Sequence, residues 1–525
     1  MVDKPAGQHA RTTRRPNVVL IMTDQHRADA LACMGNPIIR TPNIDRLATE
    51  GVLFERAFTN CPVCMASRGA IHTGRYPRSL RMPSMGILPP EEITLAETLK
   101  RAGYRTGMFG KLHFTPEGYT RDVLESDYEL TDVTPFLAPA GILSAATKAA
   151  VEDPFKTHYG FDCRYPVADN NWGHYLDWLS EVSPGHVGHH VAENWGRPRG
   201  GVKFGDSPPA TRVFHPLVSD FFDSHVPADL HPSHFIVEKA VGFIRDSRQR
   251  PFFAHVSFVD PHHPFNAPLE FSRMYPPGQM PAPAEFDRDR CYPARLPEGV
   301  LRAIQRRRTY PPELFQWALG NYYGMISQID GCIGRLLAEL DALGLSRNTI
   351  VVFISDHGEY VGDHGLLYKG SLLFDGLMRI PFIVSWPGRL SAGRRVKAMV
   401  QEIDVYPTLM SLLGLPSHPG VQGRDLSGML LGGPEQGCER VVCELDDLPD
   451  RQYAACFAIR SEQWKLIYYP GARTGMLFNL LEDPAELSNL YFEEDFAAVR
   501  GELTCDLLDH LYTSKDPLPI RLSQA

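Results

Sequence analysis

Two cysteines stand three residues apart, at Cys61 and Cys64, and an arginine follows at Arg68. Such a pair could bind zinc, act as a redox couple, supply a nucleophile or belong to an ordinary buried helix. Zinc would need a second pair of ligands at short spacing, and the sequence offers no other tight cysteine or cysteine–histidine group. A thioredoxin-like redox site finds no support elsewhere in the chain. The context therefore argues against both pair-based functions.

The stretch from Cys64 to His72 has the pattern of a helix that ends at Thr73-Gly74. A group at a helix N-terminus meets free backbone N–H donors and a positive partial charge, so an anion is favoured beside Cys64. Arg68, four residues later on the same face, can reach the same place. The alternative, a buried small thiol with an arginine at the surface, fits the spacing equally well.

Polar side chains follow each of the three clearest strand-like runs. The runs and their following groups are 18–22 with Asp24-Gln25, 252–258 with Asp260-Pro261-His262-His263, and 349–354 with Asp356-His357. Ligands of open α/β sheets bind beyond the carboxyl ends of the strands, so we expect these groups at one edge of a sheet. An aspartate after a strand is more often a turn residue or helix cap, so a structural hydrogen-bond network is the alternative.

Four of these residues form a candidate metal site, namely Asp24, Gln25, Asp356 and His357. They supply mostly hard oxygen ligands together with one imidazole. This set suits Ca²⁺, Mg²⁺ or Mn²⁺ better than structural zinc. We predict one divalent metal ion and no organic cofactor.

The elements that must position these residues are those of an α/β protein. Apolar runs alternate with amphipathic helices, such as residues 325–340, which end near Gly344. This alternation predicts a central, mostly parallel sheet flanked by helices. Residues 115–232 are rich in His, Pro, Gly and Trp and lack clean periodicity, which predicts long loops.

A change of pattern after residue 416 indicates a second, smaller unit. Short strands are predicted over 440–445, 453–460 and 464–469, and a helix near 496–511. We therefore predict a large α/β domain over residues 1–425. A C-terminal α+β domain, with an antiparallel sheet and a helix, is predicted over 426–525.

Composition limits the compartment and the partners. The 525 residues are 43% hydrophobic and 22% charged. The net charge of −9 argues against a general nucleic-acid-binding protein, which would need a basic surface. No run of about twenty apolar residues predicts a membrane span. Residues 1–15 lack the apolar run of a secretory signal, and ten scattered cysteines do not suggest a disulfide framework. We expect a cytoplasmic protein, and the insertions or the tail 513–525 could serve a homo-oligomer.

Around Cys64 the sequence resembles the sulfatase signature, in which a Cys is followed two residues later by Pro or Ala and four later by Arg. The matching run is Cys64-x-Ala66-Ser67-Arg68-x-x-x-x-Thr73-Gly74-Arg75. Further landmarks in the family's order are residues 17–24, 41–48, 110–113, 261–264, 355–358, Lys369, 379–381, 465–467 and 477–486. The resemblance spans most of the chain, apart from about 115–230 and 265–315. It implies the formylglycine, Cys-type sulfatases of the alkaline phosphatase superfamily, near the choline-sulfatase and phosphonate monoester hydrolase branch.

In this family the cysteine is converted to formylglycine, an aldehyde that hydrates to a geminal diol. The resemblance thus implies that Cys64 is the precursor of the nucleophile and that a formylglycine-generating enzyme is a partner during maturation. It also implies that Asp24, Gln25, Asp356 and His357 hold the metal, with modified residue 64 completing the shell. Ca²⁺ is the expected ion, with Mn²⁺ as the alternative.

The resemblance assigns five further roles. Arg68 would hold the diol and offset charge, while Lys111 and Lys369 would contact the sulfuryl oxygens. His113 would assist the diol, and His262 would protonate or hydrogen-bond the leaving-group oxygen. The implied activity is hydrolysis of an aryl or small alkyl sulfate monoester.

Two departures from the commoner sulfatase pattern bear on this activity. Many sulfatases have Asp where Gln25 stands and Asn where His357 stands, and the Gln-plus-His pairing is closer to the choline-sulfatase and phosphonate branch. Ala66 replaces the commoner Pro, within the variation of the maturation signal. The pairing of Lys111 with His113 is typical of sulfatases. A phosphonate monoester or phosphodiester hydrolase with promiscuous sulfatase activity is the alternative, and a non-catalytic metal-binding protein is the third possibility.

Four aromatic residues in the unmatched segment leave their role open, namely Trp172, His174, Tyr175 and Trp178. They could form a wall for an aryl group or a choline-like cation. They could equally belong to the core, which we favour.

Overall fold

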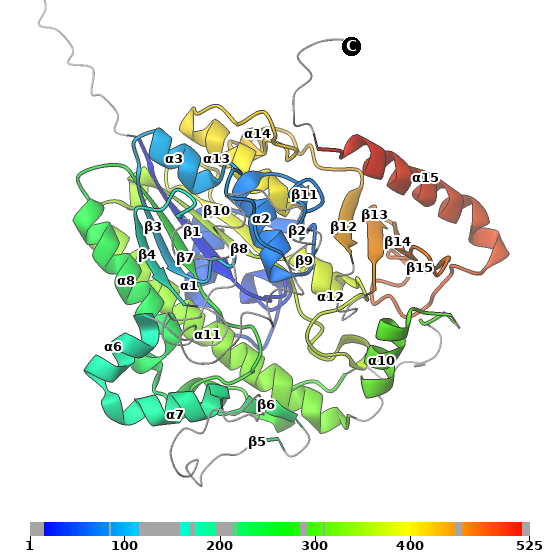
Figure 1. The fold of residues 1–525 in the computed structure, drawn as a ribbon, viewed down its shortest axis with the longest axis horizontal. Helices are drawn as coiled ribbons and strands as arrows, with labels where there is room; N and C mark the ends of the chain where they lie inside the picture. Colours follow the sequence, from blue (N-terminus) through cyan, green and yellow to red (C-terminus); the bar gives the residue numbers. More distant parts are fainter. Residues whose placement is uncertain are drawn as a thin grey trace, which may run out of the picture.

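The large sheet and its helices dominate the computed structural model (Figure 1). The structure describes residues 15–82, 84, 86–114, 158–167, 174–195, 214–215, 218–283, 291–293, 295–307, 310–446 and 454–516. Within these residues, a nine-stranded sheet is accompanied by a four-stranded sheet at one side and by a short two-stranded pair.

The strands of the large sheet follow the order β11-β2-β10-β8-β1-β7-β3-β4, and β9 pairs with β2. Their bounds are β1 Asn17–Thr23, β2 Val52–Phe58, β3 Arg105–Gly110, β4 Cys163–Pro166, β7 Phe252–Ser257, β8 Thr349–Ser355, β9 Arg379–Ile380, β10 Phe382–Ser385 and β11 Arg394–Gln401. The strands β8, β1, β7, β3 and β4 are parallel, whereas β10 is antiparallel to both of its neighbours. The predicted, mostly parallel sheet is confirmed.

Strand β1 is an unbroken apolar run because both of its faces are buried. Val18 and Leu20 belong to the apolar cluster on one face of the sheet, and Val19 and Ile21 belong to the cluster on the other face. A strand buried on both faces cannot alternate polar and apolar residues.

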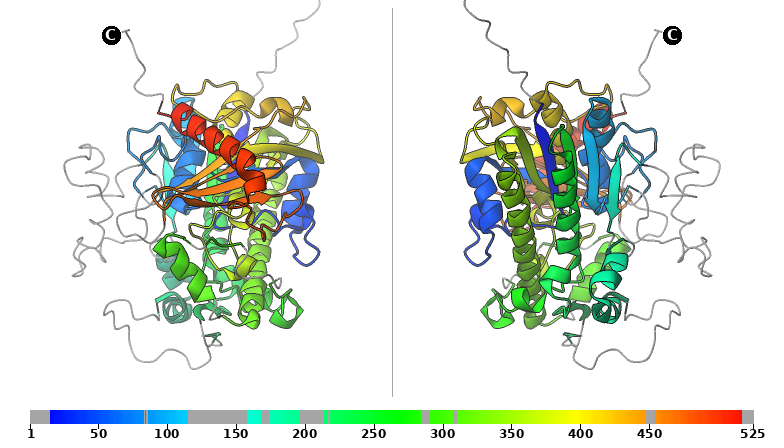
Figure 2. Two further views of the ribbon diagram at one scale, coloured as in Figure 1. Left: turned by 90° about the vertical axis from the view of Figure 1, so that its right-hand side faces the viewer. Right: turned by 90° about the vertical axis from the view of Figure 1, so that its left-hand side faces the viewer.

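Helices cover both faces of the large sheet (Figure 2). On one face lie α1 (Pro42–Glu50), α8 (Pro232–Ser247) and α11 (Pro312–Ala342); on the other lie α2 (Cys64–Thr73), α3 (Leu95–Arg101) and α13 (Val405–Leu413). The shorter helices are α9 (Leu269–Ser272), α10 (Glu298–Arg307), α12 (Asp375–Met378) and α14 (Ser427–Leu430). The helix predicted over 325–340 is the second half of α11, which ends just before Gly344.

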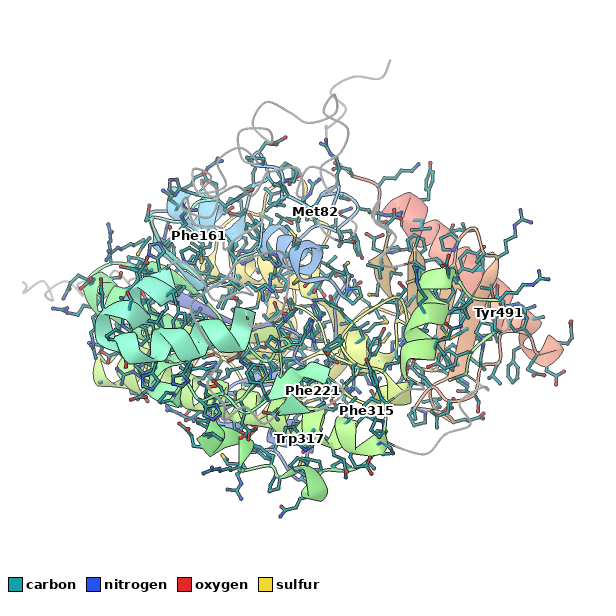
Figure 3. The ribbon with its side chains drawn as sticks, turned by 60° about the horizontal axis from the view of Figure 1, so that its bottom comes forward. Met82, Phe161, Phe221, Phe315, Trp317 and Tyr491 are labelled. Atoms are coloured by element: carbon teal, nitrogen blue, oxygen red, sulfur yellow. The ribbon has the colours of Figure 1, made fainter. Side chains whose placement is uncertain are left out.

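A third apolar cluster lies around the first half of α11. Phe221 and Phe315 are buried in it and Trp317 packs against it, as Figure 3 shows. Phe161 and Met82, also labelled there, belong to the main core on the α2 face.

The predicted C-terminal antiparallel sheet and helix are both present. The strands are β12 (Val441–Leu445), β13 (Cys456–Arg460), β14 (Trp464–Tyr469) and β15 (Thr474–Asn479), and the helix is α15 (Ala497–Thr513). One face of this sheet, with Cys443 and Ile467, joins the main core; the other, with Val442 and Leu466, packs against Leu503 of α15. The fourth strand, β15, was not predicted.

The described parts of residues 115–232 contain elements where loops were predicted. These are β4 (Cys163–Pro166), α6 (His174–Val182), α7 (Pro184–Trp195), β5 (Phe214–His215), β6 (Val218–Phe222) and a single 3₁₀ turn at Ala228–Leu230. Tyr175 is fully buried against Phe235, and Trp178 packs against the same core cluster, so these two aromatic residues belong to the core as favoured. Trp172 lies outside the described residues.

The described residues contain neither a membrane-spanning helix nor a disulfide bond. No helix in the described ranges combines the length and the apolar character that crossing a membrane requires. The ten cysteines form no disulfide bond.

Candidate active site

The ends of four parallel strands meet at one edge of the large sheet. In the register, Thr23 pairs with Ser355, and Ser257 pairs with both Met22 and Gly110. The segments after these strands therefore begin at the same level. They carry the predicted residues Asp24, Gln25, Lys111, His113, His262, Asp356 and His357.

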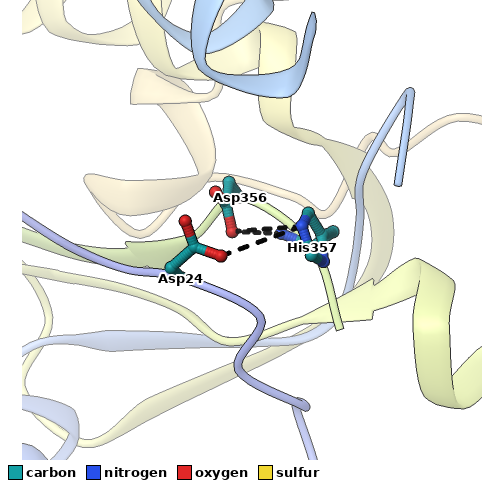
Figure 4. Close-up of side chains that lie close together, drawn as sticks. All are labelled: Asp24, Asp356 and His357. Atoms are coloured by element: carbon teal, nitrogen blue, oxygen red, sulfur yellow. Dashed lines mark hydrogen bonds and ion pairs between the residues drawn. The ribbon is translucent and has the colours of Figure 1, made fainter. Parts of the chain in front are cut away.

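Three of the four predicted metal ligands form a tight, buried cluster (Figure 4). One potential ligand atom from each of Asp24, Asp356 and His357 lies within 4.8 Å of the others. His357 Nε2 lies 3.9 Å from Asp24 Oδ1 and 4.0 Å from Asp356 Oδ1. The backbone N–H of Gln25, the fourth predicted ligand, donates to Asp356 Oδ1 over 3.0 Å.

The electron pairs of this cluster fit a hard divalent cation. His357 Nδ1 lies 2.8 Å from the carbonyl oxygen of Gly358, which can only accept, so Nδ1 carries the proton and Nε2 keeps its lone pair. Asp24 Oδ1 and Gln25 Oε1 are buried and receive no hydrogen bond from any described residue. Because buried polar atoms normally have partners, these oxygens are suited to a metal ion such as Ca²⁺ or Mn²⁺.

Two buried cations balance the carboxylates. Arg68 donates from Nε to Asp356 Oδ2 over 2.8 Å and from Nη2 to Asp24 Oδ2 over 3.0 Å. Lys111 Nζ lies 2.6 Å from the same oxygen of Asp24. Burial alone would raise the pKa of Asp24, but Lys111, His262 and Arg68 outweigh it and hold that pKa well below its usual range. Asp24 is therefore an ionised carboxylate.

Cys64 is the first residue of α2, as predicted. Val63 is the N-cap, and the helix ends at Gly74, whose φ of 67° is left-handed. Arg68 is only 1% exposed, so the alternative with a surface arginine is wrong. Burial raises the pKa of the Cys64 thiol, but Lys111 and Lys369 outweigh this and the pKa falls below its ordinary value of 9.0. The position thus favours a negatively charged group.

Lys369 connects the nucleophile position to two imidazoles. Its Nζ lies 3.8 Å from Cys64 Sγ and 3.3 Å from Nε2 of both His262 and His357. His262 Nδ1 donates to the carbonyl oxygen of His263 over 2.6 Å, which leaves Nε2 on the side of Lys369. Contacts thus join five of the six predicted catalytic side chains to one another or to the metal cluster.

His113 is the sixth. It follows β3 in the loop that carries Lys111, is partly buried, and has a left-handed φ of 59°. The loop brings it to the same edge of the sheet.

Two buried carboxyl groups beside the site were missed at the level of sequence. Glu359 accepts a hydrogen bond from the side-chain amide of Gln25, and Glu402 contacts Ser67 on α2. Glu359 stands three residues after Asp356, and that proximity is a signal that could have found it. Glu402 is 335 positions from Ser67, so no local pattern relates them.

The contacts of Glu402 determine where its proton lies. Ser67 Oγ is 2.7 Å from the carbonyl oxygen of Asp356 and 2.7 Å from Glu402 Oε2. Ser67 Oγ has one proton for these two acceptors, so both contacts can be full hydrogen bonds only if Glu402 is protonated. Glu402 Oε1 accepts from the backbone N–H of Asn60 over 2.8 Å. Burial raises the pKa of Glu402 well above its ordinary value, in agreement with a neutral acid.

Glu402→Gln is expected to keep both hydrogen bonds and to remove a pH dependence of stability. As the pH rises above 4.5, the unfolded wild-type chain ionises Glu402 while the folded chain keeps the proton, so the free energy of unfolding falls. One group contributes a slope of at most about 1.4 kcal/mol per pH unit. Urea unfolding of both proteins from about pH 5 to about pH 8 measures the difference. Identical pH dependence in the two proteins would contradict the neutral acid.

The sequence matches known protein families over most of its length. A sulfatase family model matches residues 16–415, and a model for the C-terminal part of N-sulphoglucosamine sulphohydrolase matches residues 362–512. An arylsulfatase from Clostridium perfringens is 28% identical over 508 residues, which is 92% of this chain and 91% of the relative. A multifunctional alkaline phosphatase superfamily protein from Trinickia caryophylli is 26% identical over 520 residues, with 92% and 93% covered.

Solved structures agree with the sequence families. The crystal structure of the phosphonate monoester hydrolase of Agrobacterium radiobacter has a TM-score of 0.78 and 28% identity, and covers 97% of this chain and 98% of that chain. The matched sulfatase region, residues 16–415, contains all of the site residues described above. The chain therefore belongs to the sulfatase family, a family of sulfuric ester hydrolases in the alkaline phosphatase superfamily.

Proposed function

We propose that the protein hydrolyses sulfate monoesters of an aryl or small alkyl alcohol, using a formylglycine made from Cys64 and one divalent metal ion. The observation that carries this proposal is the meeting of Cys64 and Lys369 with the ligand cluster of Asp24, Asp356 and His357 at one sheet edge. A chain with a net charge of −9 needs such a local set of cations to hold an anionic ester.

The hydrated formylglycine has two hydroxyl groups, and each has a separate task. One hydroxyl gives up its proton to solvent, and its oxygen attacks sulfur and forms an O–S bond as the S–O bond to the alcohol breaks. The departing oxygen takes a proton from Nε2 of protonated His262. His113 then takes the proton of the second hydroxyl, so that the aldehyde re-forms as the carbon–oxygen bond to sulfate breaks and sulfate leaves. Addition of water to the aldehyde restores the diol. A thiol or a serine side chain has no second hydroxyl on the same carbon, so it could not release sulfate in this way.

The cations of the chain hold the sulfuryl group and the ligands. Lys111 and Lys369 balance the charge that builds on the non-bridging oxygens in the transition state. Arg68 pairs with both aspartates and holds their carboxylate groups in place. A metal ion held by Asp24, Gln25, Asp356 and His357 would supply Lewis-acid polarisation and a lowered pKa for the attacking hydroxyl.

A phosphonate monoester or phosphodiester hydrolase with promiscuous sulfatase activity is the second candidate. The Gln25 and His357 ligand pair favours it, as does the similarity to the Agrobacterium phosphonate monoester hydrolase. The pairing of Lys111 with His113 favours sulfate instead.

Rates on p-nitrophenyl sulfate and on p-nitrophenyl phenylphosphonate separate the two candidates. With protein produced together with a formylglycine-generating enzyme and loaded with Mn²⁺ or Ca²⁺, we expect the higher kcat/KM on the sulfate. A preference of several orders of magnitude for the phosphonate would establish the second candidate instead. Turnover of neither ester by metal-loaded protein that carries formylglycine would support a non-catalytic metal-binding protein.

The same preparation tests the modification of Cys64. Mass spectrometry of the peptide that contains residue 64 should show the decrease in mass that accompanies the conversion of CH₂SH to CHO. An active enzyme with an unmodified thiol at residue 64 would contradict the proposed nucleophile.

A further inference from the structure

Glu359 is a fully buried carboxylate on which three N–H donors converge. Its Oε1 accepts from the backbone N–H of Val361 over 3.0 Å and from the backbone N–H of Tyr368, and its Oε2 accepts from Nε2 of Gln25. None of the roles described above uses this residue. Among the described side chains, the one that hydrogen-bonds to Glu359 is Gln25, a proposed metal ligand.

The backbone of Gln25 is held independently of Glu359. Its N–H donates to Asp356 Oδ1 over 3.0 Å, its carbonyl oxygen accepts from Tyr322 Oη over 2.7 Å, and its φ is 63°. The remaining freedom is in the side chain, where rotation of the planar amide by half a turn exchanges its oxygen and nitrogen.

Glu359 decides between the two orientations of this amide. With Nε2 on Glu359, and 3.4 Å from His263 Nδ1, the oxygen of Gln25 is directed away from the carboxylate. This Oε1 is buried and receives no hydrogen bond from the described part of the chain. In the opposite orientation the amide oxygen would face the carboxylate, with repulsion between two acceptors and a hydrogen bond lost.

We propose that Glu359 is a positioning residue, which orients the amide of Gln25 so that its oxygen, and not its NH₂ group, is presented to the metal ion. The proposal rests on the metal site of the proposed function. The two backbone donors, Val361 and Tyr368, hold the carboxylate rigid, so its orientation is transmitted to Gln25. Partners that orient a ligand in this way typically contribute about 10-fold to 100-fold to metal affinity.

The variant Glu359→Gln should turn the amide of Gln25 around. The new side chain can keep both backbone hydrogen bonds through its oxygen only by pointing its NH₂ group at Gln25. Gln25 must then accept that hydrogen bond with its own oxygen and present NH₂ to the metal. We expect Mn²⁺ affinity, measured by titration calorimetry on chelator-treated full-length protein, to fall by about 10-fold to 100-fold.

The exchanged pair, Gln25→Glu with Glu359→Gln, is the matched control. A carboxylate at position 25 accepts the NH₂ group of the new Gln at 359 with one oxygen and keeps the other oxygen for the metal. The charge of the pair is unchanged and an oxygen again faces the metal ion, so we expect the double variant to bind Mn²⁺ at least about 10-fold more tightly than Glu359→Gln does. Thermal unfolding of all variants confirms that each is folded.

Two results would overturn the proposal. The first is wild-type Mn²⁺ affinity in the single variant Glu359→Gln. The second is a loss of affinity that the exchanged pair does not recover, since the effect would then not act through the orientation of Gln25. Both measurements are made without any ester substrate. A failure of the proposed sulfatase activity would therefore show as intact Mn²⁺ binding without turnover.

Discussion

Cys64→Ala is expected to lower kcat/KM for p-nitrophenyl sulfate by at least about 10³-fold, because alanine has no group that can become the nucleophile. The side chain at this position lies at the first turn of α2, 3.8 Å from Lys369 Nζ. The loss should appear in kcat, measured on metal-loaded protein at matched folded concentration. Activity within tenfold of wild type would show that residue 64 is not the nucleophile.

Cys61→Ala is the matched control within the same stretch of chain. Cys61 is fully buried in the main core, and burial raises the pKa of its thiol well above the ordinary value. It therefore behaves as a packed apolar side chain. We expect a loss of about 1 kcal/mol in the free energy of unfolding and a kcat/KM within about threefold of wild type. The two variants together distinguish a nucleophile from a cysteine pair.

Arg68→Met is expected to have the largest effect on stability and a large effect on activity. It removes the guanidinium that pairs with two buried carboxylates, Asp24 and Asp356. Breaking a buried pair from one side costs about 3 to 5 kcal/mol, because uncompensated charge remains. We expect this loss in the free energy of unfolding of metal-free protein, and about a 10²-fold or greater loss of kcat.

A divalent cation should rescue part of that stability. Mn²⁺ would supply the missing positive charge, so its addition should raise the Tm of Arg68→Met by more than it raises the wild-type Tm. Scanning calorimetry with Mn²⁺ or with a chelator measures both shifts.

Arg75→Met provides a control of equal burial outside the site. Arg75 is 1% exposed, stands just beyond the end of α2, and pairs with Asp516 over 2.8 Å and with Glu92 over 3.5 Å. Its replacement should also destabilise the protein, but without the additional response to Mn²⁺. Equal Mn²⁺ responses in the two variants would show that Arg68 does not compensate the metal-binding carboxylates.

Strand β15 and helix α7 were not predicted, because their sequences lack the periodic pattern of apolar residues that indicates a strand or a helix. All six residues of β15 are buried, because the small sheet is covered by the main core on one face and by α15 on the other. Such a strand shows no alternation, and Gly475 at its second position weakens the strand signal further. Helix α7 contains Gly185 and Gly188 together with several histidines, and therefore has no clear apolar stripe.

The two buried acids beside the site, Glu359 and Glu402, were not predicted either, because no local pattern marks an acid as buried. Glu359 and Glu402 are acids in unremarkable stretches of sequence, and a buried acid cannot be told from an exposed one by type alone. Their roles follow from contacts with Gln25 and Ser67, which are more than 300 positions away in the chain.

The sequence by itself determined the three strands with long apolar runs, the polar residues that follow them and the helix that begins at Cys64. These features are local, because an apolar run, a helix terminus and the turn after a strand each depend on residues that are adjacent in the sequence. Only the tertiary structure decided which of these residues meet. Thr23 and Ser355 stand 332 positions apart, and their pairing in the sheet aligns Asp24 with Asp356. The orientation of the Gln25 amide and the proton of Glu402 were likewise decided in three dimensions, because both depend on which acceptors and donors face each other once buried.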